Sequence, residues 1–462
     1  MTNSKSEKKV PFMLYVKTLL KSVRQYKKET FLTMLFVGLE TILECVIPFI
    51  MMLLINDIEA YSQVNGMETL YKILTWAAVL LVLAGFSLTC GILSGRFCAF
   101  ASVGFSRNLR QDIYYKIQTF SFTNIDKFSV SSLVTRQTTD IMNIQLAYFL
   151  VIRIAVRSIL MLIFSIVMAF IAAPSIAWIY LILVPVLFGV LLIIVLICYP
   201  IYSAGFKKYD KLNESIQENV KGMRTVKTYV REDYEKEKFH NQAYSLQKFF
   251  KKADRLAALS SPILQFFMWT SMLCIISIGS FLIIQNHFDG VENGMSVGAL
   301  TSLITYGAQC LSSIMMVTMI LTMIIMSLES IHRVYEVLTE ENKLLEENVE
   351  GTKLTNLDDG SIEYKDVYFR YDNTSEKYAL EDINLKVKSG QTLGIIGATG
   401  SSKSTLVNLL PRFFEVTKGS LTIGGHDIKE YDIRSLREQI GMVLQKNILF
   451  SGTIKDNLLW GK

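Results

Sequence analysis

The sequence contains little cysteine, and its cysteines form no pattern of a metal site or a disulfide framework. All six lie in or beside apolar runs: Cys45, Cys90, Cys98, Cys198, Cys274 and Cys310. None has the close paired spacing of zinc ligands, and cysteine in apolar surroundings behaves as a small buried hydrophobic side chain. We therefore predict neither a structural metal ion nor a disulfide.

The N-terminus lacks a secretory signal, and the charge balance gives no sign of nucleic-acid binding. Residues 1–10 read MTNSKSEKKV, with no short apolar core and no small-residue cleavage site. The net charge is +6, but the basic residues gather between long apolar runs. Membrane topology explains that distribution, so we predict no nucleic-acid partner.

Charged residues are almost absent from six long stretches of the first 330 residues. Each approaches or exceeds the roughly 20 apolar residues that cross a bilayer. They are residues 31–55, 73–93, 150–172, 177–196, 263–284 and 297–327. Before them, the mixed basic and apolar residues at 11–28 indicate an interfacial helix, or else a soluble cap on the first span. We therefore expect a cytoplasmic N-terminus at 1–30 and an α-helical membrane domain of six transmembrane helices at 31–330.

Lysine and arginine assign the two sides of this membrane domain. The connection at 285–295 has no Lys or Arg, whereas those at 94–149 and 197–262 are rich in both. The positive-inside rule then places both termini in the cytoplasm of a multi-pass membrane protein. The two inner connections contain few Pro or Gly and keep a helical pattern, so we predict long hairpins that extend toward a soluble domain.

Four charged residues lie within the predicted spans. Glu40 and Glu44 are four residues apart, so they share one helix face near the middle of the bilayer. Each is expected to be paired, protonated or exposed to water, because an isolated charge there costs about 3 kcal/mol. They indicate either a polar patch in a substrate path or a bond between helices. Arg153 and Arg157 are expected to extend toward the interface, with no role in a site.

The sixth span is rich in methionine: Met315, Met316, Met319, Met323 and Met326. Flexible thioethers suit a cavity that accepts apolar ligands of several shapes, and they also fill ordinary helix packing. The sequence favours packing.

Pattern and composition both change near residue 361. Residues 331–360 indicate a charged linker, and residues 361–390 read as β-strands with turns. An apolar, strand-like run at 392–396 leads through a Gly-rich turn to a helix that begins near Lys403. This order of strand, loop and helix predicts a phosphate-binding loop in an incomplete α/β P-loop nucleotide-binding domain at 361–462.

The loop matches the pattern G-x-x-x-x-G-K-[ST] at all but one defining position. Lys403 is placed to reach the outer phosphates and Ser404 to ligate Mg²⁺, but Ser402 replaces the second glycine. Glycine lets the backbone approach a ligand with no Cβ in the way, so Ser402 is expected to affect nucleotide affinity. Tyr371 could stack on adenine, and Gln445, after the strand-like run 440–445, could orient Mg²⁺ or water.

These residues together resemble the ATP-binding cassette (ABC) family, in the fused layout of bacterial multidrug-type exporters. The segments that carry the resemblance are FSRNLR, LVTRQTTDI, GMRTVKTYVRE, YALEDINLKVKSGQTLGIIG, SLREQIGMVLQ and LFSGTIKDNL. The resemblance implies ATP and Mg²⁺ as cofactors. The implied nucleotide-binding residues are Tyr371, Gly397, Ala398, Thr399, Gly400, Ser401, Ser402, Lys403, Ser404, Thr405 and Gln445.

The same resemblance assigns roles. It implies that Gly397 to Thr405 form the Walker A loop, that Lys403 and the Q-loop residue Gln445 are catalytic, and that Ser404 and Gln445 hold Mg²⁺. The hairpin tips near 124–129 and 225–229 look like coupling helices. A second half-transporter, identical or related, is implied as partner, and the ending NLLWG is similar to subunits of heterodimers.

The resemblance also leaves functional alternatives open. The family's signature, Walker B pair and switch histidine follow the Q-loop, and none occurs before Lys462. We expect a C-terminally truncated sequence of an ATP-driven exporter of hydrophobic or amphipathic small molecules, multidrug or lipid-like, that does not hydrolyse ATP by itself. The alternatives are a non-catalytic subunit and, less favoured, an importer of the same fold.

Overall fold

The structure is a computed structural model that describes residues 12–64, 67–289, 295–341, 354–371, 377–445 and 448–460. It divides into two compact units. The first comprises Met1–Gln111 with Thr138–Tyr335, and the second comprises Asp112–Gln137 with Glu336–Lys462. The predicted linker segment 342–353 and the N-terminal residues 1–11 lie outside the described residues.

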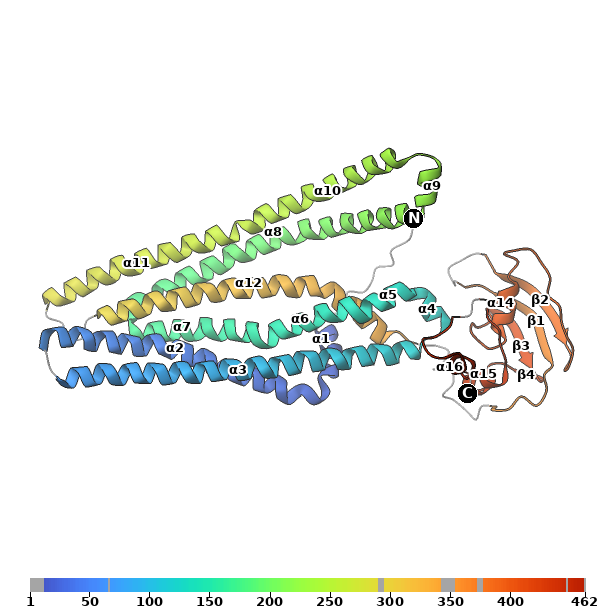
Figure 1. Ribbon diagram of the computed structural model, residues 1–462, viewed down its shortest axis with the longest axis horizontal. Helices are drawn as coiled ribbons and strands as arrows, with labels where there is room; N and C mark the ends of the chain where they lie inside the picture. The colour runs from blue at the N-terminus through green and yellow to red at the C-terminus, as the bar shows by residue number, and fades with distance from the viewer. Residues whose placement is uncertain are drawn as a thin grey trace. The chain divides into compact units, whose positions relative to one another are not determined.

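The first unit consists of helices (Figure 1). They are α1 (Phe12–Leu20), η1 (Lys21–Tyr26), α2 (Lys27–Val64), α3 (Met67–Gln118), α6 (Ile141–Phe149), η3 (Leu150–Ala155), α7 (Val156–Ala172), α8 (Pro174–Lys221), α9 (Met223–Thr228), α10 (Glu232–Ala258), α11 (Ser260–Asp289) and α12 (Val297–Thr339). Among the described residues, six helical stretches are long and apolar enough to cross a membrane. The six predicted spans are confirmed.

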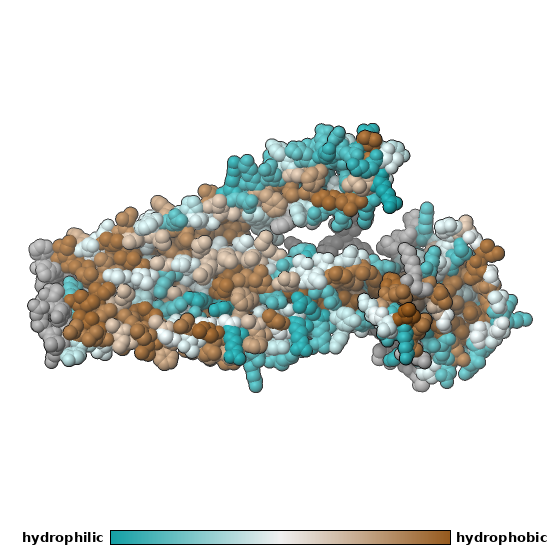
Figure 2. Space-filling view, in the orientation of Figure 1, coloured by the Kyte–Doolittle hydropathy of each residue, from teal (hydrophilic) through white to brown (hydrophobic). Residues whose placement is uncertain are grey.

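The inner connections are helical, as predicted. Helix α8 continues from its apolar part to Lys221, α9 forms the tip, and α10 returns beside α8. Figure 2 shows hydrophilic side chains over the far end of this hairpin and apolar ones over the opposite end of the first unit. The other connection contains α4 (Phe122–Phe128), α5 (Val130–Thr135) and η2 (Arg136–Asp140), so both predicted hairpin tips contain a short helix.

The core of the first unit combines buried side chains of α2, α7, α8, α11 and α12, and α8 approaches α12 closely. A Cβ on Gly307 would lie 2.7 Å from the Tyr180 hydroxyl oxygen, so this approach requires glycine. The Tyr180 hydroxyl donates to the Leu303 carbonyl, and the Tyr306 hydroxyl donates to the Cys45 carbonyl at 2.9 Å. Both rings are almost fully buried, and each hydroxyl is satisfied, as buried polar groups must be.

The second unit contains a four-stranded antiparallel sheet. Its order is β2 (Leu380–Val387), β1 (Ile362–Phe369), β3 (Lys418–Ile423) and β4 (His426–Asp427). The helices α14 (Lys403–Leu409), α15 (Ile433–Gln439) and α16 (Ile454–Leu458) complete it. Apolar residues of β1, β3, α14 and α15 form its core.

Two predicted strands are wrong. Residues 392–396 and 440–445 have no strand structure, and their apolar side chains are exposed, with Ile396 at 97% and Val443 at 89%. An apolar run of this kind forms a strand only between neighbouring strands that accept and donate its backbone hydrogen bonds. Every pairing within the described sheet is antiparallel and involves β1 to β4 alone.

The prediction for Arg157 is also wrong. Its guanidinium turns inward and bonds Glu40 Oε1 at 2.9 Å and Glu44 Oε1 at 2.7 Å, which joins α7 to α2. The Glu40 carboxylate lies against α3, where a Cβ on Gly91 would come within 3.0 Å of its Oε1. Of the two interpretations of Glu40 and Glu44, the structure supports a bond between helices.

We predict that Arg157→Met destabilises the protein by about 3 kcal/mol, because removal of one partner leaves buried charges uncompensated. The triple variant Arg157→Met, Glu40→Gln, Glu44→Gln is expected to recover most of that loss. Thermal unfolding of the purified protein measures both effects. Arg110→Met, at an exposed position of α3, serves as the control, and equal stability of Arg157→Met and the wild type would contradict the prediction.

Candidate functional site

The predicted phosphate-binding loop lies immediately before α14. The helix begins at Lys403, where the sequence predicts it. The loop closes on itself, since a Cβ on Gly397 would lie 2.7 Å from Ser401 Oγ, and Gly400 has φ +86°. Residues 397–401 are exposed, so the backbone N–H groups of the loop and of the first turn of α14 are accessible to an anion.

The ammonium group of Lys403 closes the loop. Its Nζ donates to the carbonyl oxygens of Gly397 and Ala398, both at 2.8 Å, and to Ser401 Oγ at 3.3 Å. This places a positive charge inside a ring of exposed backbone. Such a ring suits a phosphate group, whose oxygens can replace the carbonyls as partners of the ammonium.

Ser402 has a left-handed backbone conformation, with φ 59° and ψ 24°. Besides the space that a Cβ occupies, the glycine at this position of the pattern therefore has a second cause, its backbone conformation. A left-handed conformation is free of steric cost for glycine and costs other residues about 1 kcal/mol. The pattern already indicated this possibility, because a position that requires glycine needs either a close approach of the backbone to a ligand or a positive φ.

Tyr371 and Thr405 come together. Tyr371 follows β1, and its hydroxyl lies 2.9 Å from Thr405 Oγ1 in the first turn of α14. The Tyr371 ring meets Phe369 and Phe414 edge to face, at centroid distances of 4.9 and 5.1 Å. The ring is 51% exposed, so an aromatic surface lies beside the loop.

Gln445 and Ser404 are both exposed. Gln445 follows the segment that forms no strand, and within the described part of the chain no hydrogen bond joins it to residues 397–405. The structure therefore groups Tyr371 with the loop and with Thr405, and leaves the proposed role of Gln445 a prediction.

The helix α4 packs on the nucleotide-binding fold within the second unit, as the prediction of a hairpin that extends toward a soluble domain implies, although the sequence did not specify the contacting residues. The Phe122 ring lies 4.4 Å from the Phe413 ring and 6.0 Å from the Phe414 ring. Arg437 covers the Phe413 ring at 5.2 Å, and burial, followed by the charge of Arg412, lowers the pKa of Arg437. Since Phe414 also touches Tyr371, an unbroken aromatic row joins α4 to the loop.

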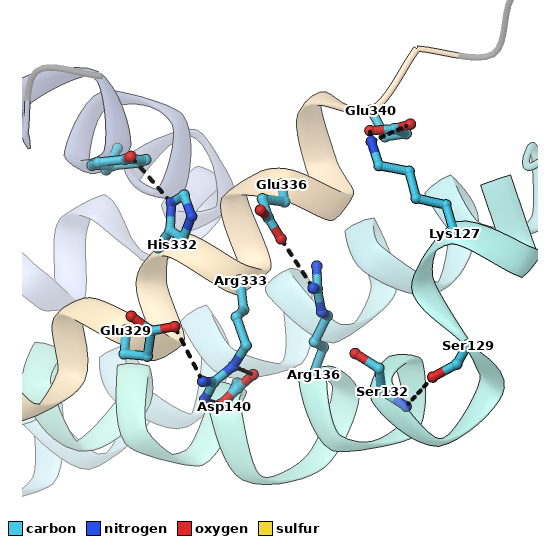
Figure 3. A network of polar contacts seen from close by, with 11 residues as sticks. Lys127, Ser129, Ser132, Arg136, Asp140, Glu329, His332, Arg333, Glu336 and Glu340 are labelled. Carbon is cyan, nitrogen blue, oxygen red and sulfur yellow. Dashed lines mark hydrogen bonds and ion pairs between the residues drawn. The ribbon is translucent and has the colours of Figure 1, made fainter. Parts of the chain in front are cut away.

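Ion pairs hold the same segment to the end of α12 (Figure 3). Lys127 Nζ lies 2.7 Å from Glu340 Oε2, and Arg136 Nη2 lies 2.9 Å from Glu336 Oε2. Asn124 also donates to Glu340 Oε1 at 3.2 Å. These contacts are internal to the second unit and join α4 and η2 to the end of α12.

The first unit contains a cavity of about 1040 Å³ between α6, α8, α11 and α12. Met315, Met319, Met323 and Met326 line it, so these thioethers face open space and do not serve packing alone, contrary to the preferred interpretation of the sequence. Leucine, isoleucine and two tyrosines, Tyr199 and Tyr202, form much of the remaining wall.

Several residues that line the cavity belong to a polar network, and Figure 3 shows Arg333 of this network between Asp140 and Glu329. Arg333 Nε donates to Asp140 Oδ2 at 2.8 Å, and Ser330 Oγ donates to Asp140 Oδ1 at 2.9 Å. Asp140 is completely buried. Asn143 Nδ2 donates to Ser330 Oγ at 3.0 Å, and Glu329 lies at the edge of the network.

Comparison with known proteins identifies both parts of the chain. The family description "ABC transporter transmembrane region" matches residues 30–314, and "ABC transporter" matches residues 380–460. An uncharacterized ABC transporter ATP-binding protein of Bacillus subtilis, YfiB, is 30% identical over 395 residues, which cover 86% of this chain and 67% of the relative. An ATP-dependent lipid A-core flippase of Desulfotalea psychrophila is 31% identical over 366 residues, or 77% of this chain and 60% of the flippase.

A third relative, an uncharacterized ABC transporter ATP-binding protein of Mycobacterium tuberculosis, is 28% identical over 440 residues and covers 95% of this chain. The first matched region contains most of the apolar helices, and the second contains the phosphate-binding loop, α14 and the segment around Gln445. With a six-helix membrane region followed by an ATP-binding region in one polypeptide, the chain belongs to the ABC transporter family and has the domain order of a half-transporter.

Proposed function

We propose that the chain is one half of a dimeric, ATP-driven exporter of hydrophobic or amphipathic small molecules. The cavity of about 1040 Å³ is the observation that carries this proposal, because it is of the size of small-molecule pockets and has an adaptable methionine wall. The likeness to a lipid A-core flippase also favours a lipid-like or amphipathic substrate. We place the protein in the plasma membrane with both termini in the cytoplasm.

The loop supplies the nucleotide site in this proposal. Lys403 and the N–H groups of residues 397–405 hold the phosphates, Tyr371 stacks on the adenine, and Ser404 with Gln445 holds Mg²⁺. Mg²⁺ takes few ligands from protein and the rest from phosphate and water, which suits a site with two uncharged side chains. The nucleotide supplies the free energy that shifts the conformational equilibrium of the transporter.

The aromatic row from Tyr371 through Phe414 to Phe122 supports a coupling role for α4. A nucleotide that moves the Tyr371 ring changes its edge-to-face contact with Phe414, and Phe414 in turn contacts Phe122. Helix α4 continues along the chain through α5 and η2 into α6, which lines the cavity. The second candidate, a non-catalytic subunit, is favoured by the left-handed Ser402.

For the main proposal, we expect inside-out vesicles with the complete gene product to accumulate an amphipathic dye when ATP is added. Lys403→Ala is expected to abolish accumulation, since its ammonium group is lost from the loop, and Lys388→Ala, an exposed lysine outside the loop, is expected to leave it intact. The purified protein of residues 1–462 should hydrolyse ATP no faster than the Lys403→Ala variant of the same length. ATP-independent accumulation would contradict export, and uptake in the opposite direction would favour an importer.

For Ser402, we predict that Ser402→Gly binds Mg-ATP about threefold to tenfold more tightly than the wild type, because glycine lets the phosphates approach the backbone with no Cβ in the way. Ser402→Ala keeps the Cβ and loses only the hydroxyl, so its affinity should stay close to that of the wild type. Equilibrium binding of a fluorescent ATP analogue measures all three. Equal affinities of Ser402→Gly and wild type would contradict the prediction.

For coupling, we predict that nucleotide binding slows amide hydrogen exchange in residues 122–128 of the wild type, and that Phe122→Ala removes this response while the affinity for nucleotide stays within about twofold. Phe120→Ala is the matched control, because Phe120 stacks on Phe128 and belongs to the same hairpin tip. An unchanged exchange response in Phe122→Ala would exclude the aromatic row as the route.

A further inference from the structure

Three sulfur-containing side chains from distant parts of the sequence come together inside the first unit. They are Cys45 on α2, Met161 on α7 and Cys310 on α12. The Cys45 thiol donates to Met161 Sδ at 3.6 Å. Spacing along the chain could not reveal this group, because 116 residues separate Cys45 from Met161.

Two contacts place Cys310 beside Cys45. The Tyr306 hydroxyl donates to the Cys45 carbonyl oxygen at 2.9 Å, and Cys310 follows Tyr306 by one helical turn on the same face of α12. Ser165 Oγ lies 3.7 Å from Cys45 Sγ, and the same hydroxyl interacts with the Cys310 thiol. Both thiols therefore border one hydroxyl group, where α2, α7 and α12 meet.

The two thiols are removed from water, and the thioether is not. Cys45, Cys310 and Ser165 are almost fully buried, whereas Met161 is half-buried. A single buried thiol behaves as a small apolar group, but two thiols and a thioether in one place are a set of soft metal ligands. Met161 is the side from which an ion can reach the thiols.

These donors suit a soft, monovalent ion. Thiolate and thioether sulfurs favour Cu(I), whereas Zn²⁺ sites use Cys, His and carboxylate ligands. Hard cations require oxygen ligands, and the Glu44 carboxylate, next to Cys45 in the chain, is already bonded to Arg157 at 2.7 and 2.9 Å. Among the described residues, no group of three or more His, Cys, Asp or Glu could hold a metal ion, so a site here depends on the thioether.

We propose that Cys45, Met161 and Cys310 form a binding site for Cu(I). One thiol loses its proton to the solvent, and its sulfur forms a bond to the ion. The second thiol and Met161 Sδ donate lone pairs and stay neutral. The charge of the ion replaces that of the lost proton, so the occupied site has no net charge, as a site away from water requires.

A bound ion links α12 to α2 and α7. Helix α12 also lines the large cavity, through Met315 and the methionines that follow it. Occupation of the site therefore restrains a helix of the proposed transport cavity, and this consequence rests on the proposed function. The binding itself requires neither ATP nor transport.

The test measures Cu(I) binding by the purified chain in phosphatidylcholine nanodiscs, without nucleotide and without oxygen. Ascorbate keeps the copper reduced, and bathocuproine disulfonate, whose Cu(I) complex is coloured, competes for it. Cys45→Ala and Cys310→Ala each remove one thiol, and Met161→Leu keeps the size of the side chain and removes its sulfur. Cys98→Ala is the control, because it removes a buried thiol that contacts the Phe149 carbonyl oxygen, at 3.9 Å.

We expect the wild type to hold one Cu(I) per chain against the chelator, and Cys45→Ala and Cys310→Ala to lose it. Met161→Leu should bind about tenfold more weakly or worse, because even the outer partners of metal ligands contribute about that much. Cys98→Ala should match the wild type. Equal losses in Cys98→Ala and Cys45→Ala would overturn the proposal, as would wild-type affinity in Met161→Leu or the absence of chelator-resistant copper.

X-ray absorption at the copper edge decides the case in which a cysteine variant does not fold. The wild type should show three sulfur neighbours, and Met161→Leu should show two. The same number of sulfur neighbours in both proteins refutes the site. Because neither measurement contains nucleotide, a failure of ATP-driven accumulation would refute the proposed export and leave the copper site intact.

Discussion

The desolvation of charge constrains which helices of the first unit can meet. A charged side chain away from water requires a partner of opposite charge at hydrogen-bond distance. Glu40 and Glu44 meet that requirement through Arg157, and Asp140 meets it through Arg333. The first set joins α2 to α7, and the second joins α12 to the residue that precedes α6. Each pair therefore determines which helix faces must meet.

The parts of the fold that depend on local pattern could be predicted, and those that depend on distant partners could not. The spans and hairpins follow from apolar runs and helical periodicity, and α14 begins at Lys403 because the loop pattern is local. Arg157 finds Glu40 and Glu44 across 117 and 113 residues, and no periodicity specifies such a pairing. The same holds for Phe122, whose partners Phe413 and Phe414 lie almost 300 residues further along the chain.

The two strands that were predicted and are absent from the described structure, and the left-handed Ser402, show two different limits of prediction from sequence patterns. Residues 392–396 have the composition of a strand, but strand formation is a property of a pair of segments, and the described sheet consists of β1 to β4. For Ser402, the motif identified a position that normally requires glycine. It did not say why glycine is required there. Glycine can be required by space, by φ, or by both, and only the backbone angle of 59° separates them.

The cavity and the phosphate-binding loop each present a charged side chain in largely uncharged surroundings, and the two charges have opposite sign. The loop gathers backbone N–H groups and the Lys403 ammonium to face an anion, and the cavity leaves one carboxylate, Glu329, exposed beside apolar side chains. Arg333 is the instructive contrast, because it lines the same cavity and yet contributes no net charge once its bonds to Asp140 are counted. The net charge of the cavity wall therefore depends on which wall residues are paired with groups behind them, and a count of the lining residues alone would miss Asp140.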